Sequence, residues 1–253
     1  MRLPFSDRFR SVLTSAQRVV AFTGAGISAE SGVPTFRGEG GIWKKMRAEE
    51  LASMNGFLQN PALVWEWYQH RRTIISTVEP NAGHRALVAM ESIFPVMTVI
   101  TQNIDNLHRR AGSAAIFELH GNIERNYCVK CGKPYQEADV PLREGLPACT
   151  ACSGLIRPDV VWFGEMLPED QWEGSVRASE SADVFFSIGT SAVVYPAASL
   201  PLVAKRAGAF LVEVNPDPTP LTDSVNEFLK GTAGEILPAV VEVARFVRKE
   251  NVA

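Results

Sequence analysis

Residues 19–29, VVAFTGAGISA, decide the fold of this chain. The apolar run Val19–Phe22 predicts a buried strand, and the following Gly24, Ala25 and Gly26 begin a G-x-G-x-x-G/A turn, which binds dinucleotides when it follows a strand. Glycines let the backbone approach a pyrophosphate, and the N-terminus of the next helix favours its negative charge. A tight strand-to-helix turn without a ligand is the alternative interpretation of this motif alone.

Four further apolar runs predict buried strands, and helical patterns separate several of them. Fully apolar short strands that alternate with helices are typical of a mostly parallel sheet covered on both faces. We therefore predict an α/β fold built on a Rossmann-like parallel sheet. The four runs are Val96–Thr101, Ile116–Leu119, Val184–Ile188 and Phe210–Val214.

The composition sets broad limits on function. The 253 residues carry a formal net charge of -3, which disfavours a protein that grips phosphate backbones, so we expect no direct nucleic-acid partner. We find no apolar run of the roughly 18 to 20 residues that a membrane helix needs, and no signal-peptide pattern in residues 1–17. We expect a cytoplasmic protein that does not insert into a membrane.

Four cysteines form two closely spaced pairs. Cys128 and Cys131 are separated by 17 intervening residues from Cys149 and Cys152, which matches the C-x2-C-x15–20-C-x2-C pattern of zinc sites. Four thiolates close the tetrahedral coordination sphere, which predicts one structural Zn²⁺ rather than a catalytic one. Two disulfides or an iron–sulfur cluster are the alternatives, and a reducing compartment disfavours the disulfides.

Two segments interrupt the alternation of strands and helices. Residues 38–80 read as loop and helix where a second Rossmann strand is expected, and residues 123–156 are polar, cysteine-bearing and rich in Pro and Gly. We interpret them as a helical insertion and a zinc-binding insertion that together form a smaller module. The Rossmann-like domain then comprises residues 1–37, 81–122 and 157–253, and residues 1–253 form a single catalytic unit.

Polar residues follow the predicted strands, at the sheet edge where α/β proteins bind ligands. Gln102, Asn103 and Asp105 can hydrogen-bond sugar hydroxyls and a carboxamide, although Asn103 or Asp105 can instead cap the next helix. His120 is a candidate general base because its unperturbed pKa lies near neutrality, and a structural histidine is the alternative. Small polar groups that suit phosphate and ribose also end two strands: Gly189, Thr190, Ser191 and Asn215.

The glycine-rich turn continues differently from that of a dehydrogenase, whose second strand ends in a ribose-binding acid. Here residues 31–38 run directly into the insertion. Arg37 beside Phe36 can clamp a phosphate and shield an unstable intermediate from water. A surface ion pair for Arg37 and a core position for Phe36 are the alternatives.

A predicted helix from Ala62 to about Thr77, capped by Asn60, carries two unusual residues on its apolar stripe. Tyr68 and Arg71 are three residues apart and therefore adjacent on that face. A phenol and a guanidinium presented together suit a carboxylate ligand. An internally paired Arg71 is the alternative.

Taken together, these segments resemble the sirtuin family from about residue 18 to 240. The matching stretches are GAGISAESGVPTFRG (24–38), TQNIDNLHRRAG (101–112), HGN (120–122), the two cysteine pairs, RPDVVWFGE (157–165) and GTS (189–191). The stretch WEWYQHRR (65–72) looks like that of the class III subgroup, which removes succinyl, malonyl and glutaryl groups. The C-terminal GTAG (231–234) is a looser match.

The resemblance implies an NAD-dependent protein-lysine deacylase that acts on acylated protein lysines, with acetyl a further possible substrate, and works as a monomer. The acyl-lysine amide oxygen would attack the nicotinamide ribose as nicotinamide leaves, giving an alkylamidate. His120 would then take a proton from a ribose hydroxyl that attacks the amidate, which yields lysine and O-acyl-ADP-ribose. NAD is consumed, whereas zinc is structural.

The resemblance also assigns roles to individual residues. Catalysis would involve His120, Asn103, Phe36 and Arg37. Contacts with NAD are expected from Gly24, Ala25, Gly26, Thr35, Phe36, Arg37, Trp43, Gln102, Asn103, Ile104, Asp105, Gly189, Thr190, Ser191, Asn215 and Ala233. The acyl chain would meet Tyr68 and Arg71, and the substrate backbone would add as a strand along Val161, Trp162, Phe163 and Gly164.

Three other functions compete with this hypothesis. A plain deacetylase or an ADP-ribosyltransferase uses the same scaffold without an acidic acyl pocket. A sensor of NAD or ADP-ribose would bind without turnover and would not need a base at His120. A zinc-ribbon nucleic-acid binder is disfavoured by the acidic charge balance.

Overall fold

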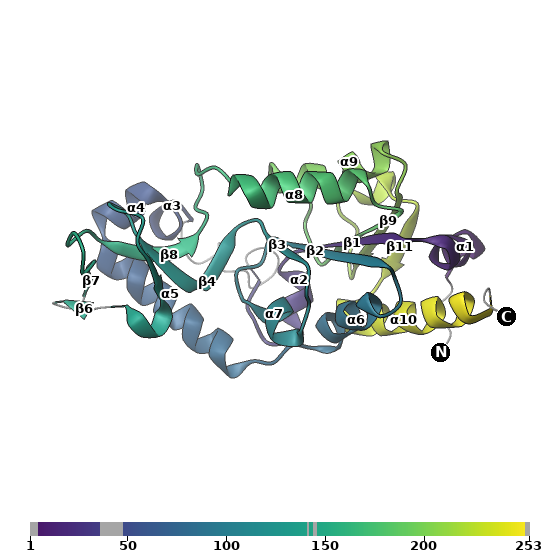
Figure 1. Cartoon of the computed structure of the whole chain (residues 1–253), viewed down its shortest axis with the longest axis horizontal. Helices are drawn as coiled ribbons and strands as arrows, with labels where there is room; N and C mark the ends of the chain where they lie inside the picture. The colour runs from purple at the N-terminus through teal and green to yellow at the C-terminus, as the bar shows by residue number, and fades with distance from the viewer. Residues whose placement is uncertain (1–4, 36–47, 141, 144–145, 251–253) are drawn as a thin grey trace.

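A computed structural model describes residues 5–35, 48–140, 142–143 and 146–250. Three of the predicted site residues, Phe36, Arg37 and Trp43, lie outside the described residues. The molecule is elongated, with a parallel sheet and its helices toward one end and a smaller module at the other (Figure 1). No helix among the described residues is both long and apolar enough to cross a membrane.

The main sheet confirms the predicted α/β fold. All its strands are parallel, in the order β11-β10-β9-β1-β2-β3. The chain adds strands on one side of β1 and then crosses over to the other side, as in a Rossmann fold, so that β1 and β9 flank the switch point. The strands are β1 (Arg18–Thr23), β2 (Val96–Thr101), β3 (Ile116–Glu118), β9 (Val184–Ile188), β10 (Phe210–Asn215) and β11 (Glu227–Lys230).

Strand alternation divides the core into two layers. Val19 and Ala21 of β1 are buried on one face, and Val20 and Phe22 on the other, because successive side chains of a strand point in opposite directions. Both faces are therefore apolar, as the continuous apolar run predicts. Figure 1 shows α8 (Glu169–Glu180) and α9 (Leu200–Arg206) over one face, and α6 (Ala82–Glu91) and α10 (Ala233–Glu250) over the other.

The remaining helices are short, apart from two. A nine-residue helix, α1, begins after Ser6, whose hydroxyl accepts a hydrogen bond from the Phe9 backbone. Helix α5 begins at Pro61 after the Asn60 cap, as predicted, and continues to Thr77. Helix α1 spans Asp7–Ser15, and the others are α2 (Gly26–Ala29), α3 (Ala48–Leu51), α4 (Met54–Gln59), α7 (Leu107–Ala111) and the 3-10 helices η2 (Glu137–Asp139), η3 (Ala197–Ser199) and η4 (Thr222–Ser224).

The smaller module combines the helical and cysteine-bearing insertions around one apolar core, which includes Phe57, Trp65 and Ile156. Its antiparallel sheet has the order β5-β4-β8, and a separate hairpin pairs β6 with β7. The sheet extends a few residues beyond the predicted boundaries 123–156 because β4 begins at Gly121. The strands are β4 (Gly121–Cys128), β5 (Pro134–Gln136), β6 (Leu142–Arg143), β7 (Leu146–Pro147) and β8 (Ile156–Val160).

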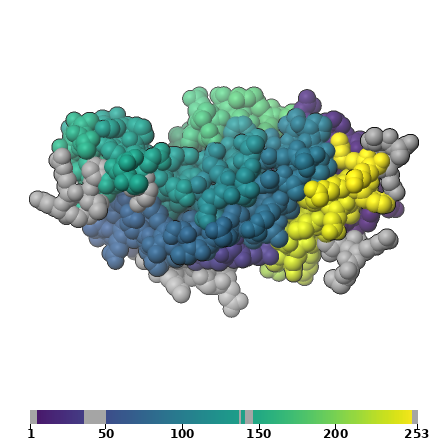
Figure 2. Space-filling model, turned by 60° about the horizontal axis from the view of Figure 1, so that its bottom comes forward, coloured from purple at the N-terminus to yellow at the C-terminus, as the bar shows by residue number. Residues whose placement is uncertain are grey.

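The two insertions also lie together on the surface. Figure 2 shows the helical insertion in blue and the cysteine-bearing insertion in teal at one end of the molecule, whereas the yellow α10 lies at the opposite end. The module is joined to the sheet domain through α5 and through β4, so it can form one wall of a cleft whose other wall is the edge of the main sheet.

Candidate active site

A cavity of about 520 Å³ lies at the carboxyl ends of the main strands, between the sheet and the smaller module. Its floor comes from the residues that follow four strands: Gly24 after β1, Gln102 after β2, Gly189 after β9, and Asn215 at the end of β10. Parallel strands carry their carboxyl ends to the same sheet edge, which is why residues distant in sequence meet here.

The glycine-rich turn packs against the end of β9 with no room for side chains. The amide of Gly26 donates to the carbonyl oxygen of Gly189 at 2.8 Å, and the amide of Gly24 donates to Ile188 at 3.0 Å. A Cβ on Gly26 would lie 2.6 Å from the Cα of Gly189. The open backbone that results lines the cavity, and helix α2, which has only four residues, contributes only a small dipole.

Asn103 is held beneath the same turn. Its side-chain amide donates to the carbonyl of Gly24 and to the hydroxyl of Ser28, both at 3.1 Å, and Ser28 donates to Asp105 at 2.7 Å. Asp105 also accepts from the backbone of Leu107, the first residue of α7, at 3.0 Å, whereas the N-cap of that helix is Asn106. Burial raises the pKa of this carboxyl. Asn103 lines the cavity, whereas Asp105 supports it from behind.

His120 is oriented by a backbone carbonyl. Its Nδ1 lies 2.9 Å from the carbonyl oxygen of Gln102, which can only accept, so Nδ1 carries the hydrogen and Nε2 keeps a free lone pair. Burial lowers the pKa of His120, and the bond to Gln102 opposes that shift. A neutral imidazole with an available Nε2 on the cavity wall has the form that a general base requires.

Thr190 ties three strand ends together. The side-chain amide of Gln102 donates to its hydroxyl at 3.0 Å, and that of Asn215 donates to its carbonyl oxygen at 3.0 Å. Ser191 lines the cavity beside it. These bonds fix a polar rim at one end of the cavity.

The opposite wall comes from helix α5 and the loop after β8. Tyr68 is almost fully buried, and its hydroxyl accepts a hydrogen bond from the indole of Trp162 at 2.7 Å. Arg71 is also buried, with its guanidinium 5.2 Å from the ring of Trp67, and burial lowers its pKa while Tyr68 and Asp105 raise it. Tyr68 lines the cavity, but Arg71 is not among the described residues that do so.

Residues 161–164 all line the cavity, but part of their backbone is already paired. The amide of Val161 donates to His120, and that of Phe163 donates to Ala52. A substrate strand would therefore have to pair with other backbone groups of this loop. Gly164 has φ +87°, a value that favours glycine at this turn.

Of the remaining predicted residues, Thr35 and Ile104 line the cavity. Ala233, the first residue of α10, does not line the cavity because it is buried against Gly83. Its contact with an adenine stays a prediction. The sequence interpretation overlooked apolar and turn residues of the loops that follow β8, β9 and β10. These cavity-lining residues include Leu167, Val194, Tyr195, Pro216 and Pro218.

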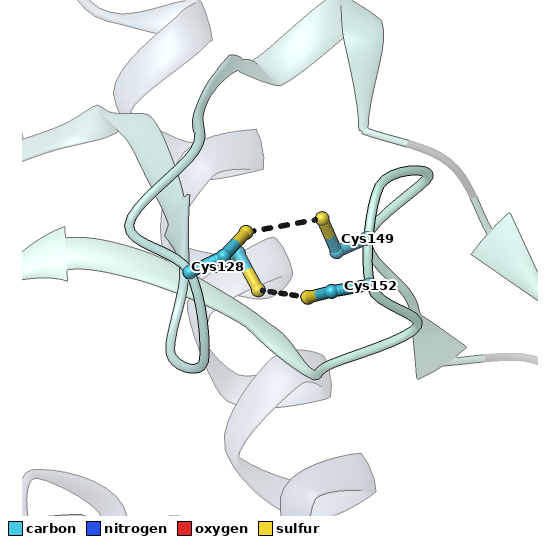
Figure 3. A group of neighbouring side chains, drawn as sticks. Cys128, Cys149 and Cys152 are labelled. Atoms are coloured by element: carbon cyan, nitrogen blue, oxygen red, sulfur yellow. Dashed lines mark hydrogen bonds between the residues drawn. The ribbon is translucent and has the colours of Figure 1, made fainter.

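The four cysteines meet at the end of the smaller module, far along the chain from the glycine-rich turn. Their Sγ atoms all lie within 4.8 Å of one another, and the pairs Cys128–Cys152 and Cys131–Cys149 are separated by 3.5 and 3.6 Å. Figure 3 shows the sulfurs directed toward a common centre. Four sulfurs around Zn²⁺ at about 2.3 Å would lie about 3.8 Å apart, so this cluster of free thiols fits structural zinc and not two disulfides.

Comparison with known proteins identifies the family. The model of the Sir2 family matches residues 24–196, which include the glycine-rich turn, His120 and the cysteines. The chain belongs to the Sir2 family. An NAD-dependent protein deacylase 2 of Pyrobaculum aerophilum is 52% identical over 231 residues, which cover 91% of this chain and 92% of the relative.

Two solved Sir2 structures resemble this Sir2 family member over nearly its full length. A Sir2 homologue–NAD complex has a TM-score of 0.88 and 44% identity, with 97% of this chain and 95% of that chain covered. A complex of Sir2 with a p53 peptide and NAD+ has a TM-score of 0.81 and 37% identity, with 97% and 98% covered. The parallel sheet, the module and their connection are therefore those of the Sir2 fold.

Proposed function

We propose that this protein removes acyl groups from protein lysines and consumes NAD. The orientation of His120 by Gln102 is the observation that carries the proposal, because a pure binding protein has no use for an imidazole held neutral with its Nε2 available. The similarity of this chain to an NAD-dependent protein deacylase, and to a Sir2 structure with a p53 peptide and NAD+, also supports the proposal.

The residues of the cavity divide the chemistry between them. Gly24, Gly26 and Gly189 offer open backbone for the pyrophosphate of NAD, and Asn103 sits beside this turn to hold the ribose. The acyl-lysine amide oxygen attacks the anomeric carbon as nicotinamide departs. His120 then accepts a proton from a ribose hydroxyl, which attacks the amidate carbon. Water adds to the same carbon and the bond to the lysine nitrogen breaks, which releases free lysine and O-acyl-ADP-ribose.

The acyl preference that we propose is for succinyl, malonyl and glutaryl groups. Tyr68 lines the cavity, and Arg71 lies one helical turn further along α5, near enough for its charge to affect the pKa of Tyr68. A guanidinium and a phenol together suit a carboxylate at the end of an acyl chain.

A plain deacetylase is the second candidate. It is favoured by the position of Arg71, which lies outside the described cavity lining and whose charge interacts with that of Asp105. In that case Arg71 stabilises the buried carboxylate of Asp105 and takes no part in acyl recognition.

One assay separates these functions. Purified protein is incubated with NAD and matched succinyl- and acetyl-lysine peptides, and O-acyl-ADP-ribose is detected by mass. We expect release of lysine from both and a higher kcat/KM for the succinyl peptide. A higher value for the acetyl peptide would favour the deacetylase, and NAD binding without turnover of either would favour a sensor.

A further inference from the structure

The hydrogen bond between Trp162 and Tyr68 has a fixed direction. An indole Nε1–H can only donate, so the Tyr68 oxygen is the acceptor in the 2.7 Å contact. The hydrogen of the Tyr68 hydroxyl is then left for another acceptor. Among the residues that the structure describes, no acceptor pairs with it, and Tyr68 lines the cavity.

Tyr68 keeps that hydrogen at every physiological pH. Its side chain is 1% exposed, and burial raises the pKa of Tyr68 to about 12. A buried, protonated phenol that already accepts one hydrogen bond has its O–H as the group that remains to be paired.

Trp162 is held in place from two directions. The guanidinium of Arg157, which is fully buried, lies 3.3 Å from the centre of the Trp162 ring. Arg157 also donates to Glu165 at 3.0 Å and to the Val160 carbonyl at 2.7 Å. The same Glu165 carboxylate accepts from the Trp162 amide at 2.8 Å, so the ion pair fixes both the ring and the backbone of Trp162.

We propose that Trp162, braced by the Arg157–Glu165 pair, is a positioning residue that sets acyl specificity by making Tyr68 a hydrogen-bond donor toward the acyl end of the substrate. This inference rests on the proposed function. It extends that function because it assigns to the Trp162 indole, a group outside the acyl contact itself, the direction of the hydrogen bond between Tyr68 and an acyl oxygen. An acyl group that ends in a methyl leaves the buried O–H unpaired and is disfavoured.

The test is a double-mutant cycle on selectivity. The ratio of kcat/KM for succinyl- and acetyl-lysine peptides is measured for the wild type, Trp162→Phe, Tyr68→Phe and the double variant. We expect Trp162→Phe to lower the ratio about tenfold, mainly through the KM of the succinyl peptide, and to lower it no further when Tyr68→Phe is already present. Additive losses would overturn the inference.

A matched control separates this role from simple loss of packing. Trp65 is also buried in the module core, and its indole donates to the Ile156 carbonyl at 2.8 Å instead of to Tyr68. Trp65→Phe removes a comparable bond, so we expect it to lower thermal stability and leave the selectivity ratio unchanged. An equal fall in the ratio for both tryptophan variants would overturn the inference.

A spectroscopic measurement distinguishes the two possible failures. The Trp162 indole N–H signal is assigned by its absence in Trp162→Phe and then followed in Tyr68→Phe by proton–nitrogen correlation, where we expect a clear shift and faster exchange. An unchanged signal would overturn the Trp162–Tyr68 contact itself. A shifted signal in a protein without succinyl preference would overturn the inference through the acyl assignment, because no acyl oxygen would then receive the hydrogen.

Discussion

Gly26 and Gly189 approach each other so closely that a Cβ on Gly26 would lie 2.6 Å from the Cα of Gly189, while the Gly26 amide donates to the Gly189 carbonyl at 2.8 Å. The contact joins the loops after β1 and β9 at the point where the strand order reverses. It leaves bare backbone on the floor of the cavity, which is what a pyrophosphate requires.

Gly189→Ala should therefore be strongly destabilising. Gly189 has φ +56° and a Cβ there would lie 2.5 Å from the Ile27 amide nitrogen, so backbone strain and a clash add to about 2 to 5 kcal/mol. Gly208→Ala is the control, because Gly208 has φ +103° with nothing within 4 Å and should show strain alone, about 1 to 2 kcal/mol. Urea unfolding of both variants measures the difference, and equal losses would contradict the clash.

The orientation of His120 predicts the pH dependence of catalysis. Burial lowers its pKa below the ordinary value of 6.5, so the neutral, proton-accepting form dominates at neutral pH. We expect kcat/KM to rise with pH through a midpoint below 6.5 and to level off by about pH 7. A midpoint above 7 would contradict the assignment.

The lowered pKa of His120 also makes the stability of the fold depend on pH. Because the folded protein holds His120 neutral more tightly than the unfolded chain does, the unfolded state binds more protons below pH 6.5. The contribution of this group to the free energy of unfolding is therefore present above pH 6.5 and is lost as pH falls.

His120→Ala should abolish formation of O-acyl-ADP-ribose while calorimetry still detects binding of ADP-ribose.

Arg71 and Arg72 offer a matched pair of buried cations. Arg72 donates to the Ile123 carbonyl at 2.8 Å and to Asn126 at 2.7 Å, which explains it as a structural residue. Arg71→Met should cost about 2 to 4 kcal/mol of transition-state binding for the succinyl peptide, or about 30- to 1000-fold in kcat/KM, and far less for the acetyl peptide. Arg72→Met should lower stability and leave the ratio of the two substrates unchanged. Equal losses for both substrates in Arg71→Met would exclude an acidic acyl pocket.

The cysteine cluster predicts one zinc ion per chain. Cys149→Ser removes a buried thiol that belongs to the module core, so we expect loss of zinc by atomic emission and a lower melting temperature. Enzyme activity should also fall when loss of zinc destabilises the module, because that module forms one wall of the cavity. Ser153→Gly is the control within the same loop, since Ser153 has φ +57° and glycine accepts that geometry; it should retain zinc. Retention of zinc by Cys149→Ser would contradict the four-thiolate site.

Parts of the fold followed directly from local patterns. The run Val19–Phe22 is apolar at every position because helices cover both faces of β1. Four of the other five strands of the main sheet were also predicted from apolar runs. The edge strand β11 was missed since it reads Glu227-Phe228-Leu229-Lys230, and an edge strand tolerates polar residues that interrupt an apolar run.

Some residues of the candidate site could be predicted from the sequence and others could not. Asn103 and His120 could be named because polar residues that end strands share one sheet edge. Arg71 shows the limit of that reasoning, since helical spacing placed it beside Tyr68 but could not show that Asp105, 34 residues later, shares its surroundings or that the cavity lining stops at Tyr68.

The sequence by itself determined the parallel sheet, the glycine-rich turn and the four-thiolate cluster, because strand burial, glycine geometry and ligand spacing are local properties. Only the tertiary structure decided the direction of the donors. The His120 ring is oriented by a carbonyl 18 residues earlier, and the Tyr68 hydroxyl by an indole 94 residues later. Hydrogen bonds need atoms about 3 Å apart at suitable angles, and only the tertiary packing of segments distant in the sequence fixes such distances.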